Sequence, residues 1–193
     1  MGQYYLPLSL EKNEAVYSHD FGNGLKLMEH SYVGNPFVAA VESLIAEGGK
    51  WFGDRIVWAG DYADPEKDEN GEEIQYEYEG KMYGLTLYHK VRENTIKPEK
   101  VKRPRYRYLV NMDTKEFVDF KKIPPTDSDT DEKGKVYYWT IHPLPLLTCE
   151  GNGRGGGDYR GESPLVGKWA RNRITISTRK PKGCKELIFD LVE

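Results

Sequence analysis

The stretch YYLPLSLEKNEAVYSHDF at residues 4–21 returns in outline at mid-chain, as YRYLVNMDTKEFVDFKK at residues 106–122. Each copy has an aromatic-rich apolar segment, a short polar turn that contains Lys and Glu, and a second segment that ends near an aspartate. Short apolar segments on both sides of a polar turn are typical of β-hairpins. The repeat therefore predicts two halves built on one plan.

A second repeated element follows each hairpin and strengthens this interpretation. The pattern Lys-Trp-x-x-x-Arg-Ile occurs at residues 50–56 and again at residues 168–174. Two elements in the same order favour a pseudo-twofold α+β protein with a mostly antiparallel sheet, and chance similarity between two hairpins is the alternative. We expect residues 1–64 to form the first pseudo-repeat, 65–104 a charged insert, and 105–193 the second pseudo-repeat, all within one globular unit.

One helix is clear from the sequence, at residues 35–47. Asn35 is a good N-cap residue, and Pro36 suits the first helical position, which needs no amide hydrogen. Apolar residues from Phe37 to Ile45 recur at helical spacing and form one stripe, and two glycines follow at 48–49. A shorter helix is expected within residues 25–32. In the second half, two prolines leave room only for a short turn at residues 146–149.

Composition places the chain among ordinary globular proteins. It has 193 residues, 38% of them hydrophobic, and a formal net charge of −3, which gives no overall attraction to nucleic acid or to an acidic membrane. No apolar run approaches the ~18–20 residues of a membrane span, and the start lacks the pattern of a signal peptide, so a cytoplasmic location is expected. Cys149 and Cys184 lack metal-binding spacing and are expected to be reduced thiols.

The stretch GNGRGGGDYRG at residues 151–161 has six glycines in eleven residues and is the first candidate binding site. Backbone amides and two arginines there could hold a phosphate or a carboxylate, as in anion-binding nests. The loop lacks the helix and acidic residue of a dinucleotide site and the Lys-Ser/Thr of a P-loop, so no cofactor is expected. A surface loop without a ligand is the alternative. The predicted ligand-binding residues are Gly153, Arg154, Gly155, Gly156, Asp158 and Arg160.

A region between the halves separates its charges. Residues 64–79 contain eight acidic groups, and residues 90–107 contain eight basic ones. A turn at 68–71 and a strand-like alternation at 81–89 predict a hairpin that lets the two runs neutralise each other. The alternatives are a basic phosphate-binding strip or an acidic surface that competes with nucleic acid. The predicted partner-binding residues are Lys100, Lys102, Arg103, Arg105 and Arg107.

A metal site is the remaining chemical candidate. Asp61 and Asp64 follow the apolar run 56–58, where a strand end commonly presents functional side chains. With Asp158 as a third ligand and His19 or His30 as a base, they would form a metal-dependent hydrolase of a phosphate-bearing small molecule. Turn capping and surface histidines are the alternative. The alternating aspartates at 127–131 lack the glycine and glutamate of a calcium loop and predict a solvated loop.

Four segments together resemble a family of small uncharacterised phage and bacterial proteins: GQYY (2–5), LKLMEHSY (25–32), WAGDYAD (58–64) and GNGRGGGDY (151–159). In that family the glycine loop, the Trp-x-x-x-Arg-Ile pattern and the Ala-Gly-Asp-Tyr-Ala-Asp segment occur within one unit. Here they are divided between the halves, so a site that needs both would be assembled across them. The resemblance implies an intracellular protein carried by a phage or a mobile element.

The function we expect is binding rather than catalysis. The size, the absence of a catalytic motif and the resemblance favour an accessory protein that binds and inhibits a host component, such as a nuclease or nucleic-acid complex or a signalling nucleotide. The partner would thus be a host protein, a nucleoprotein or a nucleotide, and not a membrane. The metal-dependent hydrolase is the alternative.

Overall fold

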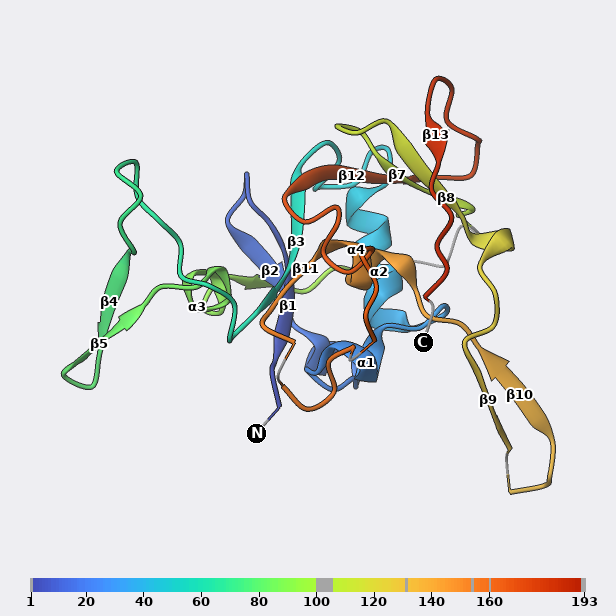
Figure 1. Cartoon of the computed structure of the whole chain (residues 1–193), viewed down its shortest axis with the longest axis horizontal. Helices are drawn as coiled ribbons and strands as arrows, with labels where there is room; N and C mark the ends of the chain where they lie inside the picture. The colour runs from blue at the N-terminus through green and yellow to red at the C-terminus, as the bar shows by residue number, and fades with distance from the viewer. Residues whose placement is uncertain (1, 100–105, 131, 154, 160, 192–193) are drawn as a thin grey trace.

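The protein is described from a computed structural model, which covers residues 2–99, 106–130, 132–153, 155–159 and 161–191. It is an α+β protein, as the sequence predicts. Nine strands form one mostly antiparallel sheet, and two strand pairs lie apart from it (Figure 1). The strands of the main sheet are β1 (Tyr5–Ser9), β2 (Glu14–Val16), β3 (Arg55–Gly60), β6 (Thr95–Ile96), β7 (Tyr108–Asn111), β8 (Glu116–Asp119), β11 (Cys149–Glu150), β12 (Asn172–Ser177) and β13 (Lys185–Glu186).

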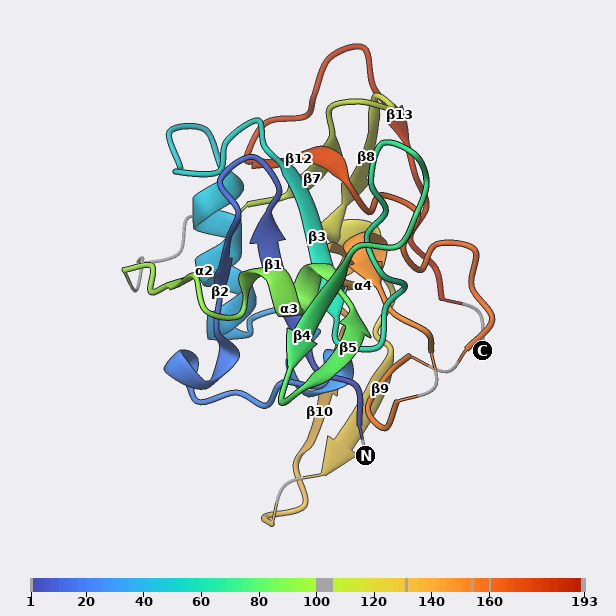
Figure 2. The same cartoon turned by 90° about the vertical axis from the view of Figure 1, so that its left-hand side faces the viewer.

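The remaining elements are the separate strand pairs and the helices, which are short except for one. The separate strand pairs are β4 (Gln75–Tyr78) with β5 (Lys81–Gly84), and β9 (Asp127–Thr130) with β10 (Val136–Trp139). The helices are α1 (Leu27–His30), α2 (Pro36–Ile45), α3 (Leu87–Val91) and α4 (Pro143–Thr148), with 3-10 turns η1 (Ser18–Phe21) and η2 (Phe120–Lys122). Figure 2 shows α3 and the β4–β5 pair on the side of the sheet that faces the viewer.

The main sheet has the same plan from either edge. Its order is β13-β8-β7-β12-β3-β1-β2-β6, with hairpins β7–β8 and β1–β2 in equivalent places. The two central strands, β12 and β3, pair antiparallel with Arg173 opposite Arg55. The edges also match, because β6 runs parallel to β2 and β13 runs parallel to β8. The two sides of the sheet thus follow one plan, and the middle segment supplies β6 to the first of them.

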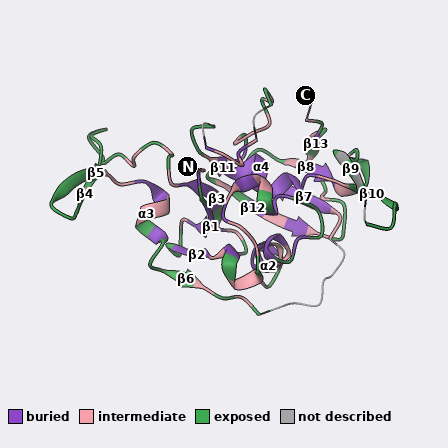
Figure 3. Cartoon of the chain, turned by 90° about the horizontal axis from the view of Figure 1, so that it is seen from below, coloured by how far each residue is buried: buried purple, intermediate pink, exposed green. Residues whose placement is uncertain are grey.

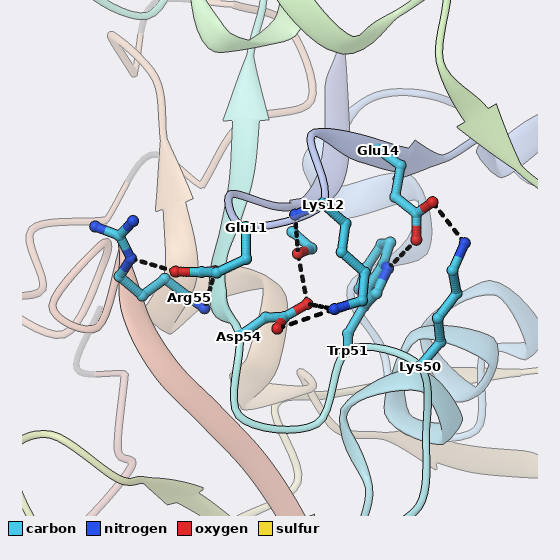
Figure 4. Close-up of polar contacts among 8 residues, drawn as sticks. Glu11, Lys12, Glu14, Lys50, Trp51, Asp54 and Arg55 are labelled. Carbon is cyan, nitrogen blue, oxygen red and sulfur yellow. Dashed lines mark hydrogen bonds and ion pairs between the residues drawn. The ribbon is translucent and has the colours of Figure 1, made fainter.

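The repeated Lys-Trp pair fastens each hairpin in the same way. In the first half, Trp51 Nε1 donates a hydrogen bond to Glu14 at 2.7 Å, and Lys50 Nζ pairs with the same carboxylate at 2.6 Å (Figure 4). In the second half, Trp169 Nε1 donates to Glu116 at 3.0 Å, and the preceding lysine pairs with that carboxylate at 3.6 Å. Both carboxylates stand at the first residue of the hairpin's second strand.

The arginine of each pattern holds the hairpin turn. Arg55 Nε donates to Glu11 Oε1 at 2.6 Å, and Arg173 Nε donates to Asp113 Oδ1 at 2.6 Å. The backbone nitrogen of each arginine donates to the same carboxylate. The spacing Lys-Trp-x-x-x-Arg therefore recurs because both residues bond to the hairpin. The Trp bonds to the first residue of the hairpin's second strand, and the Arg bonds to the hairpin turn.

The central strand β3 is buried on both faces, which explains its continuous apolar sequence. Ile56 and Trp58 belong to the larger core, together with apolar residues of α2 and α4. Val57 and Ala59 belong to a second core that includes Leu87 of α3. The sheet is thus covered by α2 and α4 on one face and by α3 on the other.

Helix α2 begins as predicted. Asn35 Oδ1 accepts hydrogen bonds from the backbone nitrogens of Phe37 and Val38 at 2.8 and 3.3 Å. The prediction of only a short turn at residues 146–149 was wrong, because α4 begins at Pro143 with His142 as its cap. Both prolines of α4 lie in its first turn, where the backbone amide would have no helical partner.

Of three further predictions, two need correction and one is confirmed. The strand expected at residues 81–89 ends at Gly84, and Thr86 caps α3 by accepting a hydrogen bond from the His89 backbone nitrogen. The turn at 68–71 is confirmed by a hydrogen bond from Gly71 N to Asp68 O. The loop expected at 127–131 is strand β9 over Asp127–Thr130. Its pairing with β10 overrides the weak strand propensity of aspartate.

Candidate functional site

The four segments GQYY, LKLMEHSY, WAGDYAD and GNGRGGGDY meet at one place. Tyr4 and Asp61 exchange two hydrogen bonds, one from the Tyr4 backbone nitrogen to Asp61 Oδ1 and one from Asp61 N to Tyr4 O, both at 2.9 Å. Met28 N donates to Gly157 O at 2.8 Å. Segments from both halves therefore assemble one site around the glycine loop.

Several glycines of this loop are needed for close packing. A Cβ on Gly155 would lie 2.3 Å from the backbone nitrogen of Gln3, and one on Gly151 would lie 2.3 Å from Tyr5 Oη. Distances this short are repulsive for any side chain. Gly157 has a φ of 83°, a conformation that favours glycine. The loop is therefore seated against the N-terminal segment, and close approach and positive φ explain its composition.

A buried polar network holds the end of the loop. Gln3 is fully buried, and the amide orientation that satisfies its neighbours places the nitrogen 2.9 Å from Asp158 Oδ2 and 2.7 Å from Tyr5 Oη. In the same orientation the Gln3 oxygen accepts from Tyr62 N at 3.2 Å. Asp158 also accepts from the Gly155 backbone nitrogen at 3.1 Å. Burial and then the nearby Asp158 carboxylate raise the pKa of Tyr5, so its hydroxyl stays protonated.

Beside this network lies a cavity of about 430 Å³, which we call the loop pocket. Its size is within the range of roughly 300–1,000 Å³ that is usual for ligand sites. Aromatic, acidic and glycine residues make up most of its wall, with one arginine. The lining residues are Tyr5, Leu27, Ala63, Asp64, Pro65, Glu66, Cys149, Glu150, Gly151, Gly153, Asp158, Tyr159, Val166 and Arg171.

Arg171 ties the two sides of the loop pocket together. Its Nε donates to Glu150 Oε1 at 2.6 Å, and its Nη1 donates to Glu66 Oε2 at 3.2 Å. Glu150 belongs to β11 of the second half, whereas Glu66 belongs to the middle segment. These two carboxylates raise the already high pKa of Arg171. The walls of the pocket are thus fixed by charge-assisted hydrogen bonds.

A second cavity, of about 770 Å³, lies on the other side of the loop and is mostly apolar. We call it the apolar groove. Asp158 and Tyr159 line both cavities, so the end of the glycine loop separates them. The other lining residues are Met28, Ile123, Pro124, Pro125, Thr126, Trp139, Ile141, Gly161, Phe189, Asp190 and Leu191.

Two hairpins stand at the ends of this face (Figure 1). We call residues 65–85, with β4 and β5, the first arm, and residues 126–139, with β9 and β10, the second arm. Pro65 and Glu66 at the base of the first arm line the loop pocket, and Thr126 and Trp139 at the base of the second arm line the apolar groove. The two arms therefore frame the face that contains both cavities.

Both arms consist largely of exposed residues (Figure 3). On the first arm Tyr78, Met82 and Tyr83 are 49%, 60% and 44% exposed, and on the second arm Val136 and Tyr138 are 50% and 71% exposed. Neither arm adds a strand to the main sheet. These side chains are therefore not required by the core.

The first arm is braced against α3. The Tyr76 ring lies 5.5 Å from the His89 ring, and the Arg92 guanidinium lies 5.9 Å from the centre of the Tyr78 ring. Burial and the nearby Arg92 lower the pKa of His89. A neutral His89 at pH 7 suits this stacked position. Aromatic and cation–π contacts thus hold β4 and β5 against the α3 region, and the Glu66–Arg171 ion pair fixes the base of the arm.

The predicted ligand-binding residues have three different placements. Gly153 and Asp158 line the loop pocket. Gly156 packs against the N-terminal segment. Arg154 and Arg160 lie outside the described residues. The described part of the loop therefore presents a carboxylate to the pocket, whereas the anion nest was expected to present positive charge.

Of the predicted partner-binding residues, Arg107 is described. Its guanidinium forms a two-pronged pair with Asp119, at 3.0 and 2.7 Å, and lies 5.0 Å from the centre of the Tyr108 ring. This pairing lowers the pKa of Asp119. The other predicted residues lie outside the described part of the chain: Lys100, Lys102, Arg103 and Arg105.

The expected neutralisation of the acidic run by the basic run is not seen in the described residues. Within 64–79, Glu66 forms an ion pair with Arg171, which comes from the second half. Arg92 and Lys97 of the basic run pair with Glu93 and Asp20 instead. Other carboxylates of the run form no ion pair with residues 90–99 or 106–107, so the first arm is acidic on its surface.

His30 has a structural role. It is fully buried, its Nε2 accepts from Trp58 Nε1 at 2.8 Å, and its Nδ1 lies 3.1 Å from Gly24 O, to which it donates. Burial lowers the pKa of His30 to about 4. Both nitrogens are engaged, so His30 has none left to act as a base. His19 is exposed and contacts the Tyr17 ring edge to face.

The proposed metal ligands do not form a metal centre. Asp61 accepts from the Tyr4 backbone, and burial raises its pKa. Asp64 lies in the wall of the loop pocket. Within the ranges that the structure describes, no three His, Cys, Asp or Glu residues come together in a way that could bind a metal. The geometry therefore gives no support to the hydrolase alternative.

Sequence reasoning missed Gln3, Arg171, the apolar groove and the second arm. Arg171 had one usable signal, because it follows the Lys-Trp pair within the repeated pattern. The others had no such signal in the sequence, since their contacts join residues far apart in the chain.

Both cysteines are free thiols, and burial raises the pKa of Cys149 to about 12.

No protein-family model, curated protein or solved structure matches this chain. Within the described residues, every helix is too short or too polar to cross a bilayer. The site must therefore be interpreted from its own geometry.

Proposed function

We propose that the protein is a non-catalytic binding protein that holds a protein partner against the face between its two arms. The observation that carries this proposal is the pair of projecting hairpins, whose exposed tyrosines, methionine and valine serve no core. Exposed apolar groups that cluster on a projection mark interaction sites. Tyr and Met are also enriched at protein interfaces.

The charge of the first arm favours a basic partner surface. Its exposed carboxylates greatly outnumber its lysines, and the described basic run does not neutralise them. Opposite charge on the partner would speed association and exclude wrong partners. The exposed acidic residues of the arm are Asp68, Glu69, Glu72, Glu73, Glu77 and Glu79.

A basic surface of this kind is typical of nucleic-acid-binding proteins. The resemblance to phage and bacterial proteins adds the expectation that the partner is a host component. Binding of the acidic arm would then exclude nucleic acid from the basic surface and inhibit the partner. Phage or mobile-element origin remains part of this proposal.

Affinity capture from bacterial lysate, followed by titration of the purified partner, tests the proposal. The wild type is compared with Tyr78→Ser/Met82→Ser on the first arm and Val136→Ser/Tyr138→Ser on the second. Phe52→Ser is the matched control, because Phe52 is 45% exposed but lies outside both arms. We expect the arm variants to lose at least about tenfold in affinity at unchanged melting temperature.

Charge is tested separately with Glu72→Lys/Glu77→Lys against the control Glu47→Lys/Glu99→Lys, which changes net charge equally away from the arm. Only the first pair should weaken binding, and the loss should shrink at high salt. Equal affinity of the arm variants and the wild type for the purified partner would refute the proposal.

A further inference from the structure

The chain beyond β13 runs toward the base of the second arm as an extended segment (Figure 1). Leu187, Phe189 and Leu191 pack against the larger core, whereas Ile188 is 64% exposed and Asp190 is also exposed. Side chains that point inward and outward at alternate residues are typical of a β-strand. We call these five residues the groove segment, because its last three line the apolar groove.

The backbone of the groove segment is largely unpaired. Strand β13 lies at an edge of the main sheet, and its pairing with β8 ends with a hydrogen bond from Leu187 N to Phe117 O at 2.8 Å. Beyond that bond, the backbone groups of residues 188–191 form no hydrogen bond with any residue that the structure describes. An extended edge with free N–H and C=O groups is a template for a further strand.

The apolar groove beside these backbone groups has room for the side chains of such a strand. Its volume is about 770 Å³, and Ile123, Trp139 and Ile141 form apolar parts of its wall. Pro124 and Pro125 form another part of the wall. Proline has no backbone N–H, so these two residues cannot donate hydrogen bonds to the groove segment. The chain thus leaves both the backbone edge and the apolar space beside it open to a partner.

A negative charge stands in the groove segment itself. Asp190 is exposed, lines the groove and forms no ion pair within the described part of the chain. A positive charge on a bound segment would be attracted to this carboxylate. The sign agrees with the basic partner surface that the acidic first arm favours.

From the unpaired backbone, the apolar walls and the charge of Asp190, we infer that the apolar groove binds an extended segment of the protein partner. This segment adds as a β-strand to the groove segment, places alternate apolar side chains in the groove and presents a basic residue to Asp190. In this mode of recognition main-chain hydrogen bonds supply affinity, and the pockets for alternate side chains supply specificity. The inference rests on the proposed function, because Thr126 and Trp139 at the base of the second arm line the same groove.

The test uses a panel of short synthetic peptides in which threonine alternates with valine, leucine or phenylalanine between terminal lysines. The control for each peptide is its analogue with N-methylated amides, which keeps the side chains but lacks the main-chain donors. Calorimetric titration of the full chain should show binding of at least one peptide and a loss of at least about tenfold on N-methylation. Hydrogen exchange followed by NMR should slow at alternate amides of residues 188–191 when that peptide binds.

The charge is tested with Asp190→Asn, which should weaken binding of the peptide by about threefold to fivefold, as expected for an exposed ion pair. The matched control is Asp64→Asn, since Asp64 is an exposed carboxylate that lines the loop pocket and not the groove. The inference is overturned if no peptide binds, if the N-methylated analogue binds equally well, or if exchange at residues 188–191 does not change. In each of these cases the proposed function stands if the arm variants still lose the partner, and it fails by itself if they keep it.

Discussion

Replacing Glu14 with alanine would remove the acceptor of a fully buried indole N–H, and we expect it to cost about 2–3 kcal/mol of unfolding free energy. Trp51 has no accessible surface, so water cannot take the place of the carboxylate. A hydrogen bond to a charged acceptor contributes about 1.5–3 kcal/mol, and a buried unpaired donor costs about as much. For a chain of this length the melting temperature should fall by roughly 4–12 °C.

Glu14→Gln separates the hydrogen bond from the charge. The glutamine oxygen can still accept from Trp51 Nε1, whereas the ion pair with Lys50 is lost. The Lys50 side chain is 51% exposed, so that pair contributes at most about 1 kcal/mol. The hydrogen bond should therefore outweigh the ion pair, and glutamine should cost no more than about half as much as alanine.

Urea denaturation followed by tryptophan fluorescence, with calorimetry as a second measurement, gives both free energies. The control is Glu116→Ala in the second half, which should lose less because its bond from Trp169 is longer, at 3.0 Å, and its side chain more exposed. The reasoning fails if Glu14→Gln is as destabilising as Glu14→Ala, or if Glu14→Ala unfolds within about 0.5 kcal/mol of the wild type.

Two further predictions concern His30 and the glycine loop. The pKa of His30 is lowered from 6.5 to about 4 by burial, so below pH 6.5 the unfolded chain binds a proton that the folded chain does not. The contribution of His30 to the unfolding free energy is fully present above pH 6.5 and falls by up to about 3 kcal/mol as the pH drops to 4. Urea titrations at pH 7, 5.5 and 4.5 measure this slope, and His30→Gln should flatten it. A slope that His30→Gln leaves unchanged would contradict this assignment. Gly155→Ala should lower the melting temperature much more than Gly156→Ala, since only the first would place a Cβ against the Gln3 backbone, whereas a Cβ on Gly156 would meet its nearest atom at 3.7 Å. Equal effects of the two alanines in thermal unfolding would show that close packing is not the reason for Gly155.

Much of the fold follows from signals that act over a few residues. Asn35 and Pro36 fix the start of α2 because capping is a local interaction. The two hairpins follow from alternating apolar residues around short polar turns. The repeated Lys-Trp-x-x-x-Arg pattern predicted a common plan for the halves, although its reason, the two hydrogen-bonded fixed points on each hairpin, became visible only in the structure.

Two predictions were wrong for different reasons: contact with a distant strand decided the first, and a local helix cap decided the second. Pro143 and Pro145 were read as helix breakers, yet both fit the first turn of α4, which is buried against β3. The segment 81–89 changes from strand to helix at Thr86, because the side chain of that residue caps α3. A segment whose residues alternate like a strand can therefore form a short helix when one face of that helix packs into a hydrophobic core.

The sequence by itself determined the α+β class, the duplicated hairpins and the principal helix, because each depends on neighbours in the chain. Only the tertiary structure decided the site. Gln3 meets Gly155, and Arg171 meets Glu66, across more than a hundred residues. Such contacts have no local sequence signal, since they depend on how the sheet brings the two halves together. The described lining of the loop pocket comes from separate segments of the chain, so the pocket follows from that assembly and not from the glycine loop alone.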